Sequence, residues 1–282
     1  MIKLIASDLD GTLLDEPNRI SKINLDAIEQ AYQKGAKFCF ATGRDLYSVG
    51  PIASLLKYPP VLVLGNGSEV YDENKNLLFQ DFFKNEHLEE VCNIMDKHDV
   101  SYMIFTTDGF YTTKDPSEVR KRFLIRIAKI RDAETARIFE TSKEKPCNNL
   151  IQITDINEFC KEKKILKVEG FNINQEPVDA VKKDLEKFTD LSHLSTGRNN
   201  VEVTNLTATK GIALKKYCEL TNIKEDEVMV IGDSHNDLSM FENFKYSFAP
   251  SNSTKEVLEK AYKVVGDCYE HAVAEAINSF IK

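Results

Sequence analysis

The chain has 282 residues, a length that predicts two domains or one large one. Its hydrophobic fraction of 42% and charged fraction of 29% are typical of a globular protein with a sizeable core. The net charge of -8 and the isoelectric point of about 5.3 argue against a nucleic-acid binder, because such a protein needs a basic surface. An anionic substrate stays compatible with this charge, since a metal ion and a few cations can form a local positive site.

The cysteine pattern and the apolar runs indicate where the protein works. None of the cysteines forms a CxxC pair, which predicts free thiols in a reducing compartment and no zinc site. They are Cys39, Cys92, Cys147, Cys160, Cys218 and Cys268. The first apolar run meets Asp8 too soon for a signal peptide. No apolar stretch approaches the roughly 20 residues that span a bilayer, so we expect a cytoplasmic protein with no membrane partner.

Short apolar runs alternate with helical patterns at the start of the chain. Strands are predicted over residues 2–7, 36–41 and 61–64, a loop over 11–20, and helices between Ser21 and Gly35 and over 45–57. Ser21 is a suitable cap for the first helix, and Gly35 is a suitable end. This alternation is typical of a parallel sheet covered by helices on both faces.

The same alternation returns near the end of the chain. Helices are predicted over residues 209–220, 253–261 and 268–281, with a short one after residue 237, and strands over 227–231, 246–249 and 262–265. The two halves together predict a Rossmann-like α/β core with a parallel sheet, formed by residues 1–83 and 190–282.

The middle of the chain has a different pattern. Helices are predicted over residues 84–98, 116–139 and 177–188, strands over 149–154 and 165–173, and a hairpin over 101–113. Asp108-Gly109 is the hairpin's turn. Because this mixed block interrupts the α/β pattern, we expect residues 84–189 to form an inserted α+β domain.

The first motif that carries chemistry is Asp8-Leu9-Asp10-Gly11-Thr12, at the end of the first predicted strand. Residues two apart on an extended segment point to the same side, so the two carboxylates would repel each other unless a cation lies between them. Mg²⁺ suits such oxygen ligands. One Asp is then suited to attack phosphorus and the other to transfer a proton. The alternative is a surface turn, and the motif alone does not decide between the two.

Three further motifs lie at predicted strand ends or a helix start. Thr42-Gly43-Arg44 offers a hydroxyl and backbone N–H groups for phosphate oxygens, or is a plain turn. Lys210 lies at a helix start, where a bound phosphate would offset its unfavourable position, or it is a solvated surface lysine. Gly232-Asp233-Ser234-His235-Asn236-Asp237 fits a metal site, or a turn followed by a helix cap.

These motifs, in this order, resemble those of the haloacid dehalogenase (HAD) superfamily. The segments FATGR, Asn66-Gly67, ATKG and GDSHND look more closely like its Cof-type phosphatase subfamily. That resemblance implies a Rossmann-like α/β core with an α+β cap inserted between the second and third motifs. It also favours a phosphatase over a dehalogenase, because family dehalogenases lack the second Asp, here Asp10, and need no metal.

The resemblance also implies roles for individual residues. Asp8 would be the nucleophile and a Mg²⁺ ligand. Asp10 would be the general acid and base, with its backbone carbonyl on the metal. Asp233 would complete the protein's metal ligands and Asp237 would orient that site. The transferring phosphoryl group would be held by Leu9, Thr42, Gly43, Lys210 and Asn236.

The resulting hypothesis is a Mg²⁺-dependent phosphatase of small phosphorylated metabolites, with sugar phosphates as the expected substrates and an aspartyl phosphate as the intermediate. We expect a monomer or a homodimer with no nucleic-acid partner. A phosphomutase and a non-catalytic phosphometabolite-binding regulatory protein stay open as alternatives. The loop Ala249-Pro250-Ser251-Asn252-Ser253 departs from the subfamily's usual small-residue loop. The basic segment 119–131 is suited to contact an anionic substrate tail or a membrane surface, but the pattern favours a solvated helix face, and His235 receives no role.

Overall fold

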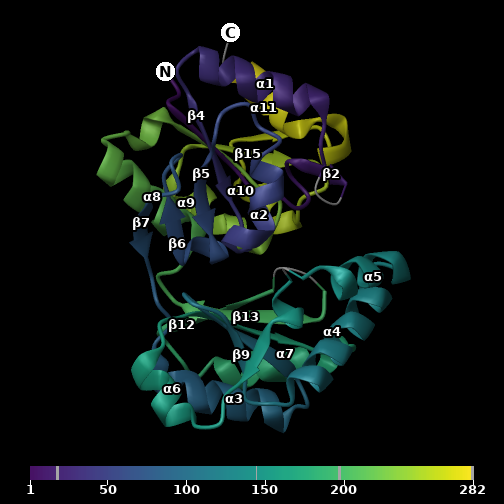
Figure 1. Ribbon diagram of the computed structural model, residues 1–282. Coiled ribbons are helices and arrows are strands. Elements are labelled where there is room, and N and C mark those ends of the chain that lie inside the picture. The colour runs from purple at the N-terminus through teal and green to yellow at the C-terminus, as the bar shows by residue number, and fades with distance from the viewer. Residues whose placement is uncertain (17–18, 144, 196–197, 281–282) are drawn as a thin grey trace. The chain divides into compact units, whose positions relative to one another are not determined.

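The computed structural model describes residues 1–16, 19–143, 145–195 and 198–280, which form two compact units (Figure 1). Unit 1 comprises Met1–Gln80 and Ala208–Lys282, and unit 2 comprises Asp81–Thr207. The sequence pattern put these limits near residues 83 and 190. The second limit lies later in the structure because β12 (Leu191–Leu194) and β13 (Asn200–Asn205), two strands that the pattern did not predict, pair within the sheet of unit 2.

Unit 1 is built on an eight-stranded sheet in the order β16-β15-β14-β1-β4-β5-β6-β7. Its parallel strands are β1 (Leu4–Ser7), β4 (Lys37–Ala41), β5 (Val61–Leu64), β14 (Val228–Ile231), β15 (Tyr246–Pro250) and β16 (Lys263–Val265). Two antiparallel strands extend the edge, β6 (Glu69–Tyr71) and β7 (Leu77–Gln80). The predicted α/β class is therefore confirmed.

Helices cover both faces of this sheet, as Figure 1 shows. They are α1 (Lys22–Gln33), α2 (Leu46–Ala53), α8 (Lys210–Thr221), α9 (Leu238–Asn243), α10 (Lys255–Lys260) and α11 (Ala272–Phe280). Neighbouring residues of the central strands enter two separate apolar clusters, one with α1 and α11 and one with α8 and α9. Ser21 caps α1 by accepting from the backbone N–H of Asn24, and Gly35 follows its end at φ +88°, as the sequence predicted.

Parts of the predicted outline of unit 1 need correction. The predicted loop 11–20 contains a small antiparallel pair, β2 (Leu14–Glu16) and β3 (Arg19–Ile20). Residues 17–18 of that loop and residue 281, the predicted end of the last helix, lie outside the described residues.

Unit 2 contains a six-stranded sheet in the order β10-β9-β8-β11-β13-β12. Its remaining strands are β8 (Ser101–Thr106), β9 (Phe110–Thr112), β10 (Leu150–Gln152) and β11 (Ile165–Phe171). Its helices are α3 (Leu88–Lys97), α4 (Pro116–Ile130), α5 (Ala133–Thr141), α6 (Ile156–Glu162) and α7 (Gln175–Leu185). The hairpin predicted at Asp108-Gly109 is confirmed, since β8 and β9 pair antiparallel on either side of it.

One predicted helix of unit 2 is in fact two. The expected helix 116–139 breaks at Arg131, whose φ of -119° and ψ of -93° are not helical. Asp132 then caps α5 by accepting from the backbone N–H of Thr135 at 2.6 Å. The periodicity continues across the break because Phe123, Ile127 and Ala136 all enter one apolar cluster, so the pattern alone does not reveal it.

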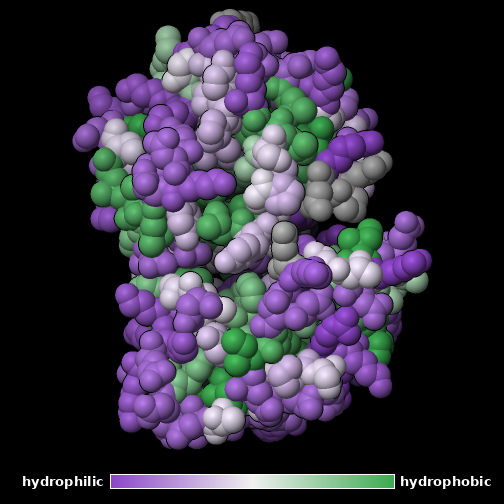
Figure 2. Space-filling model, viewed as in Figure 1, coloured by the Kyte–Doolittle hydropathy of each residue, from purple (hydrophilic) through white to green (hydrophobic). Residues whose placement is uncertain are grey.

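The visible surface is mainly polar, with small apolar groups between the charged residues (Figure 2). Among the described residues, no helix combines the length and apolar character needed to cross a bilayer.

Candidate active site

The register of the central strands of unit 1 brings three predicted motifs together at the carboxyl ends of these strands. Ser7, the last residue of β1, lies opposite Ile231 of β14 and Phe40 of β4. Asp8, Thr42 and Asp233 therefore all follow the carboxyl ends of neighbouring strands. Sites in open parallel sheets form at these ends, because the loops that leave the strands meet there.

Lys210 joins two of these motifs. It is the first residue of α8, and its side chain is fully buried. Its Nζ donates to Asp8 Oδ1 at 2.6 Å and to Asp237 Oδ1 at 2.7 Å. Burial lowers the pKa of Lys210, but the two carboxylates outweigh burial and raise it above its ordinary value. Lys210 is therefore a charged centre of the site and not a surface lysine.

Asp237 is fully buried and is held from both sides. Besides the bond from Lys210, its Oδ2 accepts from the backbone N–H groups of Asp233 at 2.9 Å and Ser234 at 3.0 Å. Both carboxylate oxygens are thus engaged by donors of the chain itself. Asp237 fixes the loop that carries Asp233, which is the geometry expected of an orienting residue.

Asp233 is held against the first motif. Its Oδ1 accepts from the hydroxyl of Thr12 at 2.9 Å. Gly11 makes this approach possible, because it has φ +85° and a Cβ there would lie 2.7 Å from Asp233 Oδ2. The sequence analysis named Thr12 only as part of the first motif and gave it no role. Its position in that motif was the available indication that it belongs to the site.

Negative charge is concentrated around Asp8. Burial raises the pKa of Asp8 well above its ordinary value against the opposing effect of Lys210, and the carboxylates of Asp237, Asp233 and Asp10 raise it further. Burial and the Asp237 carboxylate raise the pKa of Asp233 to about 6. Ligand atoms of Asp8, Asp233 and Asp237 lie within 4.8 Å of one another. Oxygen donors with excess negative charge at this spacing fit a hard divalent cation.

Asp10 has a partner that the sequence analysis did not assign to the site. Arg44 donates to both of its carboxylate oxygens, from Nε at 2.7 Å and from Nη2 at 2.5 Å. This two-point contact fixes the plane of the carboxylate. Thr42 positions the same segment, because its Oγ1 accepts from the backbone N–H of Arg44 at 3.2 Å. The position of Arg44 directly after Thr42-Gly43 was the available signal.

Two other predicted residues take less direct places. The Leu9 side chain lies in the apolar core of unit 1, so only its backbone is suited to contact a ligand. The side chain of Asn236 donates from Nδ2 to Asn66 Oδ1 at 3.0 Å. Asn66 is buried with a left-handed φ of 60°, which Asn tolerates better than most residues. Asn66 thus holds Asn236 at the site.

The loop Ala249-Pro250-Ser251-Asn252-Ser253, which departs from the subfamily pattern, is tied to the first motif. Asn252 donates from Nδ2 to the backbone carbonyl of Gly11 at 2.9 Å. Its Oδ1 accepts from the backbone N–H of Cys268 at 3.0 Å. Next to this loop, the N–H of Thr254 donates to the carbonyl of Asp233 at 2.8 Å. The loop therefore supports the site by different residues from those expected.

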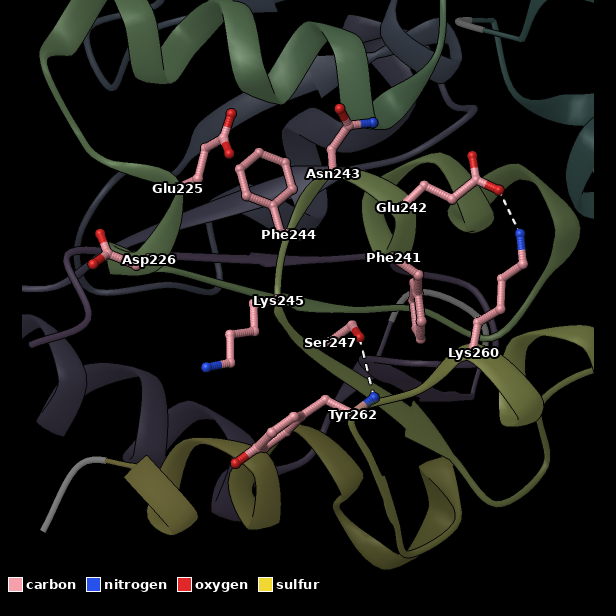
Figure 3. A pocket seen from close by; sticks show the side chains of 10 residues that line it. All are labelled: Glu225, Asp226, Phe241, Glu242, Asn243, Phe244, Lys245, Ser247, Lys260 and Tyr262. Carbon is pink, nitrogen blue, oxygen red and sulfur yellow. Dashed lines mark hydrogen bonds and ion pairs between the residues drawn. The ribbon is translucent and has the colours of Figure 1, made fainter.

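A separate surface pocket of unit 1 holds none of the predicted site residues. It has a volume of about 480 Å³ and includes Asp226, Lys245 and Tyr262 (Figure 3). These side chains lie just before β14, β15 and β16, whereas the predicted site residues follow their strands. The pocket therefore lies at the amino ends of these strands, opposite to the predicted site.

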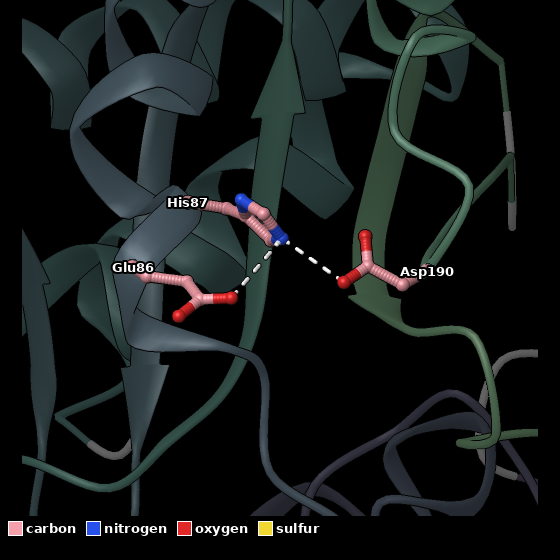
Figure 4. Close-up of side chains that lie close together, drawn as sticks. All are labelled: Glu86, His87 and Asp190. Carbon is pink, nitrogen blue, oxygen red and sulfur yellow. Dashed lines mark hydrogen bonds and ion pairs between the residues drawn. The ribbon is translucent and has the colours of Figure 1, made fainter.

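A second acidic cluster, in unit 2, comprises Glu86, His87 and Asp190 (Figure 4). His87 Nε2 lies 3.1 Å from Asp190 Oδ2. Lys84 Nζ donates to the same oxygen at 2.6 Å. Because an ammonium group already neutralises this carboxylate, the cluster does not have the excess negative charge of the site in unit 1.

The basic segment is only in part the solvated helix face that the sequence favoured, because Arg126 within it is buried. The segment 119–131 falls mostly in α4, which buries Val119, Phe123 and Ile127 against the sheet of unit 2. His235 is largely exposed, and its Nε2 lies 3.5 Å from a carboxylate oxygen of Glu256.

Comparison with known proteins identifies the family. Residues 5–277 match the haloacid dehalogenase-like hydrolases, and the chain belongs to this family. A 5-amino-6-(5-phospho-D-ribitylamino)uracil phosphatase of Bacillus subtilis is 28% identical over 99% of this chain and 96% of its own length. An HMP-PP phosphatase of Yersinia pseudotuberculosis is 23% identical over 100% of this chain and 96% of its own.

The solved structures agree with this assignment. A haloacid dehalogenase-like hydrolase from Bacillus subtilis superimposes with a TM-score of 0.84 at 26% identity, covering 99% of this chain and 100% of the other. A hydrolase from Bacteroides thetaiotaomicron shares the fold with a TM-score of 0.76 at 20% identity, with coverage of 99% for each chain. These matches confirm the predicted family, fold class and enzyme class, a HAD-type phosphatase.

Proposed function

We propose that the protein is a Mg²⁺-dependent phosphatase that hydrolyses small phosphorylated metabolites through an aspartyl phosphate on Asp8. One observation carries the proposal. The buried Lys210 bonds to both Asp8 and Asp237, and Asp237 in turn holds the loop of Asp233. Residues from three segments that are distant in sequence are thus fixed around the Asp8 carboxylate. Neither a plain turn at Asp8 nor a surface lysine at position 210 would require this arrangement.

In the proposed reaction, a carboxylate oxygen of Asp8 attacks phosphorus, and the bond from phosphorus to the substrate oxygen breaks. Asp10 donates a proton to that leaving oxygen. Asp10 then accepts a proton from a water molecule, whose oxygen attacks the aspartyl phosphate and releases inorganic phosphate and the free carboxylate of Asp8. For the first step, the Asp10 side chain exchanges its contact with Arg44 for the leaving oxygen.

Other groups of the chain hold the phosphoryl oxygens in this proposal. They are the Thr42 hydroxyl, the backbone N–H groups of Leu9 and Gly43, the ammonium of Lys210 and the amide of Asn236. Asp8, Asp233 and the backbone carbonyl of Asp10 are the proposed ligands of Mg²⁺. The bound metal would offset the charge that develops on the transferring group.

We assign substrate selection to unit 2, the proposed cap domain, which is inserted between Asn66-Gly67 and Lys210. Sugar phosphates are the first substrates to test. The substrates named for the relatives, a phosphoribitylaminouracil and HMP-PP, extend the panel.

The test is hydrolysis of p-nitrophenyl phosphate with Mg²⁺, with EDTA, and by the variant Asp8→Asn. We expect activity that requires Mg²⁺ and falls by about 10⁴-fold or more in the variant, the scale on which nucleophile removal acts in other enzymes. Asp26→Asn is the matched control, because Asp26 is exposed on α1. Activity that survives Asp8→Asn would exclude the aspartyl phosphate.

Two further outcomes separate the alternatives. Isomerised product on addition of a sugar bisphosphate would identify a phosphomutase. Wild-type protein that hydrolyses no member of the panel, yet binds one of them in a titration, would identify a regulatory binder.

A further inference from the structure

Unit 2 has a second group of charged side chains on its sheet, in which Lys167 and Glu202 are buried and Glu169 is half-buried. Lys167 and Glu169 alternate with Val168 along β11, so both lie on the face opposite to the apolar cluster that contains Val168. Glu202 of β13 lies directly opposite Glu169, and its carboxylate is 3.0 Å from Lys167 Nζ. Two carboxylates and one ammonium are thus neighbours on one sheet face, and Asn200 adds a hydrogen bond to Glu169.

Arg126 approaches this group from α4. Its guanidinium interacts electrostatically with Glu169 and Glu202. The residue is only 4% exposed. Its Nη2 donates to the backbone carbonyl of Arg198 at 2.6 Å, while its buried Nε has no hydrogen-bond partner among the described residues. Arg126 thus keeps one unused donor, its Nε–H, in the interior of unit 2.

An unused guanidinium donor in the interior is costly. Taking the charged group from water is unfavourable unless hydrogen bonds replace those lost to water. The ring of Phe171, whose centroid is 6.0 Å from Arg126 Cζ, offsets only part of this cost. Burial accordingly lowers the pKa of Arg126. A ligand oxygen that accepts from the free Nε–H would supply the missing compensation.

The surroundings favour a carboxylate as that ligand group. A planar carboxylate matches the fork of guanidinium donors and carries a single charge. A phosphate dianion would be repelled by Glu169 and Glu202, which lie in the same group. We propose that Arg126 forms a binding site in unit 2 for the carboxylate of a small-molecule metabolite. Binding of a carboxylate at this site needs no phosphatase chemistry, and only the comparison of kcat/KM values below rests on the proposed function.

Two pairs of probes test this site, and each pair differs only by a carboxylate in place of a CH₂OH group. Gluconate and sorbitol are titrated calorimetrically against the full chain, which requires no catalysis. The values of kcat/KM for 6-phosphogluconate and sorbitol 6-phosphate are compared in parallel. We expect the carboxylate probe to be favoured by about 10-fold or more in at least one pair, the size of a charged hydrogen bond.

The variants assign this preference to Arg126. Arg126→Met should abolish it, Arg126→Lys should retain part of it, and Lys121→Met, an exposed change on the same helix, should leave it intact. A preference seen in kcat/KM means that the carboxylate belongs to the substrate, whereas one seen only with gluconate means a separate effector. Equal behaviour within both pairs, or a preference that survives Arg126→Met, would overturn the proposal.

Thermal unfolding separates binding from a structural role. Removal of an incompletely compensated buried charge should leave the Tm of Arg126→Met equal to that of the wild type or raise it. A lower Tm together with an unchanged carboxylate preference would make Arg126 a structural residue and overturn the proposal. Lack of p-nitrophenyl phosphate hydrolysis would instead count against the phosphatase proposal, and the gluconate titration would still decide the role of Arg126.

Discussion

The two units bury charged side chains in different ways. In unit 1, Lys210 reaches two carboxylates at hydrogen-bond distance, and Asp237 accepts from three donors. In unit 2, Lys167 reaches Glu202, but the nearby Arg126 keeps a buried donor without a partner. The first group lies at the ends of parallel strands, and the second lies on the antiparallel strands β11 and β13 and on the neighbouring α4.

This difference indicates what each group can do without a ligand. A buried polar network is rigid when every member is satisfied, and each missing partner leaves an uncompensated desolvation cost. The connected group of unit 1 is therefore preorganised, and its excess negative charge is suited to a cation. The incomplete group of unit 2 is suited to a ligand with a hydrogen-bond acceptor, which the free Nε–H of Arg126 would bind. Three sets of substitutions test this comparison, from the largest expected effect to the smallest.

The largest effect is expected from Lys210→Met. It leaves Asp8 and Asp237 buried beside each other without their shared cation, so the free energy of unfolding should fall by about 3–5 kcal/mol. Urea denaturation in EDTA measures the change, because no metal then replaces the lost charge. Phosphatase activity should be lost as well.

The control for this substitution is Lys216→Met on the same helix. Lys216 is half-exposed and pairs with Glu219 at the surface, so its loss should cost no more than about 0.5 kcal/mol. The double variant Lys210→Met/Asp237→Asn should recover part of the stability, since one of the two orphaned charges is gone. A Lys210→Met protein as stable as the Lys216→Met control would show that unit 1 does not depend on this network.

The first group was largely accessible to sequence reasoning, because its members directly follow apolar runs or begin a helix. The carboxyl ends of parallel strands lie on the same side of a sheet. Asp8, Thr42 and Asp233 were therefore expected to lie near one another, even though the strand order was not known. Arg44 and Asn252 were not assigned, since their contacts depend on loop conformation. The strand β13 was not predicted either, and the limit of unit 2 was therefore set too early.

The second group could not be predicted for a related reason. Lys167 and Glu169 show period-two alternation, but which neighbour lies beside them depends on the register of β11 against β13. These strands are separated in sequence by α7 and β12, and no local signal specifies their pairing. Arg126 looked like one more cation of a basic helix, because only tertiary packing distinguishes it from Lys121.

A smaller effect is expected from Lys167→Met in unit 2. The change leaves Glu169 and Glu202 opposite each other without the ammonium, and the free energy of unfolding should fall by about 1–3 kcal/mol. Adding Glu202→Leu should recover most of the loss, because an apolar pair replaces a buried ion pair at little cost. Urea denaturation measures both, with the exposed Lys187→Met as control. No recovery in the double variant would mean that Glu202 has a further role.

The smallest effect concerns charges that are not buried. Asp184 on α7 accepts from Lys97 Nζ at 2.7 Å and from His98 Nε2 at 2.8 Å, and these bonds lower its pKa from 3.8 to about 2. Because the folded state favours the ionised form, the contribution is fully present above pH 3.8 and is lost as the pH falls through about 2. Asp184→Asn should therefore lower Tm slightly near neutral pH and make it fall less steeply below about pH 4. Asp179→Asn, on the exposed side of the same helix, is the control. Parallel Tm curves for wild type and Asp184→Asn in acid would mean that solvent screens this contact completely, leaving only the buried groups to distinguish the two units.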